Sequence, residues 1–114
     1  MRQSSSGVIK SGSDLGVNIN SFGRYMRAEN LSPQTFDAYV GATKQFRNYL
    51  IDQGMPLGVP DIRREHIEMF VAHLLECWKT ATDHNRYRGV QAFFEWALSE
   101  GEVKESPVAH MNPP

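Results

Sequence analysis

The sequence predicts an all-α fold: a small bundle of four main helices, followed by at most one short turn. Apolar residues recur every three or four positions in four separate segments, which is the period of one face of a helix. No segment alternates apolar and polar residues with period two, and no Asn-Gly or Asp-Gly pair marks a hairpin turn. Glycine, proline and hydroxyl residues stand at the ends of the periodic segments, where they start and stop helices.

The first two helices are predicted from periodicity and from one strong start signal. Residues 19–26 carry apolar side chains at helical spacing, although Gly23 weakens this segment. The second helix starts at Ser32, a good N-cap, which is followed by a proline that suits the first helical position. It ends at Gly54, and residues 55–62 should form an extended connection. Its apolar face comprises Phe36, Tyr39, Val40, Thr43, Phe46 and Leu50.

The third and fourth helices have broad apolar faces. The third should begin near Asp61, and the fourth should begin at Thr80 or Thr82 and end at Gly101. Residues 1–16 are rich in Ser and Gly without apolar period, so we expect a disordered leader there. The domain should then span residues 17–110, with a linker beginning at 111–114. The expected inward residues are Ile67, Phe70, Val71, Leu74, Leu75 and Trp78 on the third helix and Tyr87, Val90, Phe93, Phe94, Trp96, Ala97 and Leu98 on the fourth.

The composition excludes several classes of protein. A chain of 114 residues, 40% of them hydrophobic, accommodates one domain with a modest core. No apolar stretch approaches the roughly 20 residues that span a bilayer, and the N-terminus lacks the apolar centre of a secretion signal. We therefore expect a cytoplasmic protein that does not contact membranes. The formal net charge of −1 provides no overall attraction for nucleic acid, so such a role depends on where the cations lie.

The motifs of catalysis and metal binding are absent from the sequence. It has no glycine-rich phosphate loop and no His-Glu-x-x-His motif. The single cysteine, Cys77, excludes an internal disulfide and a multi-thiolate metal site, and we expect it to be buried as a small apolar residue. His66 and His73 lie seven residues apart without an acidic or cysteine partner at a matching offset, and we interpret them as solvated side chains. We expect no catalytic residue, no metal and no cofactor.

The order of the cap and helix motifs indicates a family. A short aromatic helix is followed by a Leu-Ser-x-x-Thr step at residues 31–35 and by Tyr39, one turn into the next helix. Residues 80–101 form a long apolar helix that ends in Glu-Gly, and a Ser-Pro pair follows at 106–107. This order resembles the N-terminal core-binding, or SAM-like, domain of tyrosine recombinases of the phage-integrase type, where Asn-Pro usually stands in place of the Ser-Pro pair. The resemblance extends over residues 18–114.

The resemblance implies a function in DNA recombination and integration of mobile elements. In this family the core-binding domain is a small orthogonal helical bundle, joined by a linker to a larger catalytic domain that supplies the nucleophilic tyrosine. Together the two domains clamp duplex DNA. The expected partners are therefore double-stranded DNA, the protein's own catalytic domain and further recombinase protomers assembled on DNA. Because the sequence contains no catalytic half, we expect this chain not to cleave or join DNA alone.

The candidate DNA-binding residues lie on the second and fourth helices, which in the family cross and face the major groove. DNA phosphates are met by cations, hydroxyls and backbone N–H groups. Lys44 and Arg47 are three residues apart and can share one helix face. Thr80 and Thr82 stand at a helix N-terminus, which attracts an anionic phosphate. The candidate set is Lys44, Arg47, Asn48, Thr80, Thr82, His84, Asn85, Arg86 and Arg88. Arg24 and Arg27 of the first helix could flank DNA, but we do not include them in this set.

An alternative without DNA remains open for these residues. Lys44 and Arg47 could form a solvated helix face, Thr82 could serve as a helix cap, and Arg86 and Arg88 could pair with carboxylates on neighbouring turns. The near-zero net charge and the mixed-sign third helix suit a helical protein–protein interaction module. The placement of Lys44, Arg47, Thr82 and Arg86 on one concave face would favour DNA binding, and their scatter would favour the alternative.

Overall fold

Four α-helices make up most of the chain that the structure, a computed structural model, describes. The described residues are 14–77, 80–109 and 111, with the backbone alone for 80–85. In these ranges no β-strand forms, and Asp14 makes an isolated antiparallel bridge with Gly58. The predicted all-α class with four helices is therefore confirmed. The elements are α2 (Leu15–Ala28), α3 (Pro33–Gln53), the 3-10 turn η2 (Val59–Asp61), α4 (Arg64–Cys77) and α5 (Thr80–Ser99).

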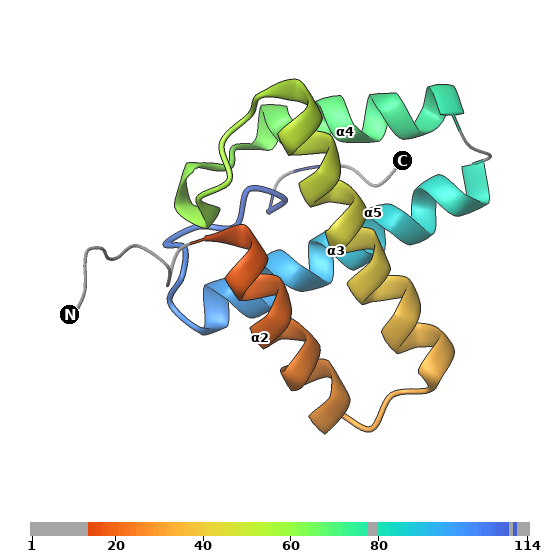
Figure 1. The fold of residues 1–114 in the computed structure, drawn as a ribbon, viewed down its shortest axis with the longest axis vertical. Coiled ribbons are helices and arrows are strands. Elements are labelled where there is room, and N and C mark those ends of the chain that lie inside the picture. Colours follow the sequence, from red (N-terminus) through yellow and green to blue (C-terminus); the bar gives the residue numbers. More distant parts are fainter. Residues whose placement is uncertain (1–13, 78–79, 110, 112–114) are drawn as a thin grey trace.

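Helix α3 occupies the centre of the bundle. It contacts α2, α4 and α5, and its contact with α5 is the most extensive in the fold. Figure 1 shows α2 beside α3, α4 across its C-terminal end and α5 passing behind it at a steep angle. Because α5 crosses α3 instead of running along it, α5 begins on one flank of α3 and ends behind α2 on the other.

Local capping explains where α3 begins and ends, as the sequence predicts. The Ser32 hydroxyl oxygen accepts a hydrogen bond of 3.2 Å from the Thr35 backbone N–H, and proline occupies the first turn. At the other end Gly54 has a φ of +69°, in the left-handed region that glycine adopts without a steric penalty. The Met55 N–H then donates to the Leu50 carbonyl oxygen at 2.9 Å and closes the last turn.

The start of α2 corrects the expected leader, which was placed at residues 1–16. The Asp14 carboxylate accepts a hydrogen bond of 3.1 Å from the Val17 N–H, so the helix begins at Leu15. The Leu15 side chain is fully buried, and its N–H donates to the Leu57 carbonyl oxygen at 2.8 Å. A contact with residue 57 cannot be read from local periodicity. The rest of the expected leader, residues 1–13, lies outside the described residues.

The connection before α4 also differs from the expected extended segment. Val59–Asp61 forms a 3-10 turn that buries Val59 against the core. Helix α4 consequently begins at Arg64 and not near Asp61. The backbone N–H of Arg63 donates to Nδ1 of His66 at 2.9 Å, which satisfies a donor at the helix start.

Aromatic and aliphatic side chains share the core, and the aromatic rings pack against one another in pairs. Phe22 and Phe93 meet edge-to-face with centroids 5.5 Å apart, and Phe46 meets Phe70 at 5.1 Å. The broad apolar face predicted for the last helix, α5, is confirmed at Phe93, Phe94 and Trp96, which are all buried. The fully buried large side chains are Tyr87, Phe22, Phe46, Phe70, Phe93, Phe94, Leu15, Leu50, Ile67, Leu74, Val59 and Val90.

Three side chains that were expected inside are exposed. Leu75 is 54% exposed and Leu98 is 42% exposed, because the core takes narrower stripes of α4 and α5 than the apolar pattern suggested. Cys77, expected to be buried, is exposed as the last residue of α4, which extends past α3 at that end (Figure 1). Trp78 lies outside the described residues.

The segment after α5 packs back onto the bundle. Gly101 has a φ of +77°, and the Glu102 N–H donates to the Ala97 carbonyl oxygen at 2.9 Å. Val103 and Val108 are buried, and Met111 packs against the core, so the packed unit reaches one residue past the expected boundary at 110. No helix within the described ranges is both long and apolar enough to cross a membrane.

Candidate nucleic-acid interface

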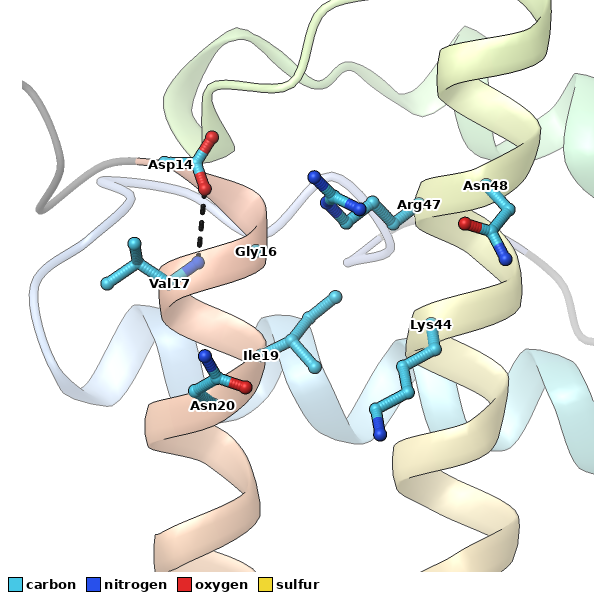
Figure 2. Close-up of a pocket in the computed structure, with 8 residues that line it drawn as sticks. All are labelled: Asp14, Gly16, Val17, Ile19, Asn20, Lys44, Arg47 and Asn48. Carbon is cyan, nitrogen blue, oxygen red and sulfur yellow. Dashed lines mark hydrogen bonds between the residues drawn. The ribbon is translucent and has the colours of Figure 1, made fainter.

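Three of the predicted DNA-binding residues line one cavity. Lys44, Arg47 and Asn48 of α3 border a cavity of about 530 Å³, whose other wall is the first turns of α2. Figure 2 shows Lys44 and Arg47 pointing from α3 toward α2. Their spacing of three residues places both on the same face of α3, as predicted.

The guanidinium of Arg47 projects from α3 toward α2 in this cavity (Figure 2). The side chain is half-buried, and its Nε is excluded from solvent without a hydrogen-bond partner among the described residues. A Cβ on Gly16 would lie 3.1 Å from that Nε, so the absence of a side chain on α2 makes room for the guanidinium. A buried donor left unsatisfied costs about 1–3 kcal/mol. Arg47 therefore has one buried N–H group that no described group accepts, and its remaining guanidinium N–H groups are the ones an anion in the cavity could reach.

One carboxylate, that of Asp14, borders the cavity. Its Oδ2 accepts the hydrogen bond from the Val17 N–H that caps α2. The ion pair found in the described part of the chain joins Arg64 to Glu68 on α4, at 3.1 Å, and involves neither Arg47 nor Lys44. Both cations of α3 are thus available to an external anion.

The cavity continues along the same two helices. A second cavity of about 420 Å³ is lined by Arg24 and Arg27 of α2 and again by Lys44 of α3. Ile19, Asn20 and Lys44 border both cavities, so the two cavities adjoin along α2 and α3. Of the described residues that line the two cavities, Asp14 alone carries a carboxylate. We call this feature the α2–α3 groove, with the polar residues Asn20, Arg24, Arg27, Lys44, Arg47 and Asn48.

Sequence reasoning left Arg24 and Arg27 outside the candidate set. The available signal was their spacing with Asn20, since positions 20, 24 and 27 share one helix face. Arg27 also lies over the Phe36 ring, 5.2 Å from its centroid, a cation–π contact between α2 and α3. The missing information was that α2 lies across the groove from Lys44, and this depends on helix packing.

The candidates on α5 form a separate group. Arg86 is half-buried with its Nε excluded from solvent, whereas Arg88 is exposed. Thr80, Thr82 and the next residues form the first turns of α5, which begins on the flank of α3 opposite to α2 (Figure 1). Among the described side chains, neither Arg86 nor Arg88 lines the cavity of Lys44, Arg47 and Asn48. The side chains of Thr80, Thr82, His84 and Asn85 lie outside the described part of the chain.

The two histidines on α4 have contacts within the fold. His66 accepts the Arg63 N–H, and the His73 ring lies 5.1 Å from the Tyr49 ring. The Cys77 sulfur is 3.9 Å from Nε2 of His73. Over the described ranges, no group of three or more His, Cys, Asp and Glu residues could hold a metal ion.

One ionisable group in the core has a shifted pKa. Burial raises the pKa of the Tyr87 hydroxyl above its usual value. The negative charge of Glu95, about two helical turns further along α5, raises this pKa again. Tyr87 is 1% exposed, so its hydroxyl belongs to the core and not to the groove.

Comparison with known proteins agrees with this architecture. In the described part of the chain, four helices with α5 laid across α3 form a small all-α bundle of the SAM-like class. Residues 19–102 match the family model described as phage integrase, N-terminal SAM-like domain, and the chain belongs to this family. The resemblance noted in the sequence is therefore confirmed. No curated protein and no solved structure matches the chain. The SAM-like domain of integrases is not itself catalytic.

Proposed function

We propose that this chain is the DNA-binding, core-binding domain of a tyrosine site-specific recombinase. It holds duplex DNA at the recombination site while a separate catalytic domain cleaves and joins the strands. The observation that carries this proposal is the α2–α3 groove, which gathers four cations beside one carboxylate in a chain whose formal net charge is −1. Concentrated positive charge on one face attracts the phosphate backbone even when the total charge does not.

The start of α5 would supply a second set of contacts. Arginine and asparagine side chains can hydrogen-bond to guanine and adenine edges in the major groove, and a helix N-terminus attracts phosphate. The exposed Arg88 is suited to an outside ligand, whereas the half-buried Arg86 has less of its side chain available. The residues proposed for this contact are Thr80, Thr82, His84, Asn85, Arg86 and Arg88.

The proposed partners follow from the same role. The domain would act in the cytoplasm on double-stranded DNA, together with its own catalytic domain and with further recombinase protomers assembled on the site. With few phosphates contacted, the isolated domain would bind weakly and with a strong dependence on salt.

The test is an NMR titration of the isotope-labelled domain with a generic duplex at low salt, repeated at high salt. The proposal expects shifts concentrated in residues 44–48 and 80–88, and in residues 20–27 across the groove. These shifts should disappear as salt is added, because phosphate contacts release counterions. An unchanged spectrum at low salt, or shifts scattered over the whole bundle, would refute DNA binding by this domain.

A second candidate function is a helical protein–protein interaction module. It is favoured by the separation of Arg86 from the cavity of Lys44 and Arg47, the described part of the scatter that the sequence analysis named as its sign. It is also favoured by an apolar cavity of about 360 Å³ where α2, α3 and α5 meet. Tyr25 and Leu31 border it and are 43% and 38% exposed, and Glu29 and Glu95 add acidic groups. The same titration discriminates between the two functions, since this candidate predicts no response to DNA at low salt.

A further inference from the structure

We propose that the α2–α3 groove binds the phosphodiester backbone of one DNA strand, with one phosphate seated between Arg47 and Lys44 and a neighbouring phosphate between Arg24 and Arg27. This inference rests on the proposed function and specifies how the DNA is held. It makes α2 a wall of the DNA-binding site, although the sequence pattern directs attention to α3 and α5.

Arg47 offers the cavity a guanidinium with one buried, unpartnered N–H group. Its Nε–H is buried, has no hydrogen-bond partner among the described residues, and belongs to a guanidinium that points across the groove toward α2 (Figure 2). A guanidinium presents a planar fork of donors that matches two oxygens of a phosphate. Because the Nε is closed to solvent, a phosphate in this cavity would meet the guanidinium through its terminal Nη groups, which the packing around Nε holds in place.

Other polar side chains that line the cavity add to the donors of Arg47. Lys44 lies one turn from Arg47 on the same face and supplies a second positive charge, and the amides of Asn20 and Asn48 supply neutral donors. The one bordering carboxylate, Asp14, already accepts the Val17 N–H. The cavity has a volume of about 530 Å³, which leaves room for a phosphate between the two helices. This donor set suits an anion with several oxygens.

The length of the groove favours a DNA strand over a single phosphate ion as the ligand. A single ion would need the cavity at Arg47 alone. The groove instead continues past Lys44 to Arg24 and Arg27, so positive charge is repeated along its length from both walls. Repeated cations along a groove are the feature that tracks a polyanionic backbone.

The experiment measures binding of a fluorescently labelled generic duplex by the full chain across a salt series. For each phosphate contact removed, the slope of log K against log[salt] should fall by about 0.9. Arg47→Met should therefore lose one such increment and bind about tenfold more weakly at low salt, and Arg24→Gln should reduce the slope similarly. Arg47→Lys keeps the charge without the fork, so it should retain the slope while binding more weakly than the wild type.

Arg63→Gln is the matched control. Arg63 is an exposed arginine before α4 and lines neither cavity of the groove, so its substitution should leave the slope unchanged. If the wild type binds with a salt-dependent slope but Arg47→Met and Arg24→Gln bind as it does, the groove inference is wrong and the proposed function stands. If the wild type shows no binding at low salt, both are wrong.

A second measurement does not depend on the folding of any variant. The Nε–H signal of Arg47 in the wild-type NMR spectrum should shift when duplex DNA is added and stay in place with an equal concentration of inorganic phosphate. A shift of equal size with inorganic phosphate would make the cavity a site for a free anion and overturn the strand assignment. An unmoved Arg47 signal on a protein that binds DNA elsewhere would overturn the inference as a whole.

Discussion

Gly89 of α5 lies so close to Ala42 of α3 that a Cβ on Gly89 would stand 2.6 Å from the Cβ of Ala42. The same atom would lie 3.1 Å from the Tyr39 carbonyl oxygen and 3.2 Å from the Tyr39 Cα. Backbone atoms of α3 thus limit the space, and they cannot move aside as a flexible side chain can. The close approach brings α5 against the central helix that carries the α2–α3 groove, so the crossing fixes both proposed DNA contacts relative to each other.

Gly89→Ala should destabilise the domain by about 1–3 kcal/mol, because overpacking at this crossing outweighs the better helix propensity of alanine. The free energy of unfolding from urea denaturation measures the effect. Gly41→Ala is the matched control: Gly41 lies in the interior of α3 with nothing within 4 Å of an added Cβ. It should stabilise by about 0.5–1 kcal/mol. Equal effects at the two positions would contradict the close contact.

Ser32→Ala should lower the free energy of unfolding by about 1 kcal/mol, because the Ser32 hydroxyl oxygen accepts the Thr35 N–H at the start of α3. Ser32→Asp keeps an acceptor at the N-cap and should retain most of the stability. Thermal melts of the three proteins decide the matter. An Ala variant as stable as the Asp variant would show that the hydrogen bond from the Thr35 N–H to Ser32 does not stabilise the start of α3.

The features predicted correctly from sequence are those that depend on neighbouring residues. Ser32, Gly54 and Gly101 act within a few residues of their own position, so they mark helix ends without knowledge of the fold. The start of α2 was misplaced although its N-cap, Asp14, is a local signal; the Ser- and Gly-rich composition outweighed it, and the bond from Leu15 to Leu57, distant in sequence, could not be foreseen. Apolar periodicity also cannot state how wide a stripe the core accepts, which is why Leu75 and Leu98 are exposed.

The candidate site shows the same division. Spacing correctly placed Lys44 and Arg47 on one face of α3. The groove, however, arises from α2 packing opposite that face, and no local signal states that Arg24 and Arg27 lie across from Lys44. For the same reason, the sequence could not indicate that the start of α5 lies on the other flank of α3.

Cys77 should react with a thiol reagent such as Ellman's reagent in the folded protein, because its side chain is exposed at the end of α4. Without denaturant, absorbance should report one reactive thiol per chain, the number of cysteines in the sequence. The same reaction in denaturant is the control for stoichiometry. If labelling required denaturant, the thiol would be buried, as the sequence pattern first suggested.

Stability should fall above about pH 10, because Tyr87 ionises more readily in the unfolded chain than in the folded one. Burial raises the pKa of Tyr87 in the folded state, and the charge of Glu95 raises it further. A raised folded-state pKa contributes stability that is fully present below the unfolded pKa and is lost as the pH rises through the folded pKa. The prediction therefore concerns alkaline conditions and leaves stability near neutral pH untouched.

Urea unfolding of the wild type and of Tyr87→Phe at a series of pH values from 8 to 11 tests whether Tyr87 causes the loss of stability at alkaline pH. The variant has no ionisable group at position 87, so it should lose less stability than the wild type between these limits. The difference between the two proteins at pH 8 gives the effect of the substitution on packing and is subtracted first. Glu95→Gln should move the ionisation of Tyr87, followed by tyrosinate absorbance, to lower pH, because one cause of the raised pKa is removed. If Tyr87→Phe loses as much stability as the wild type, Tyr87 is not the source of the alkaline instability.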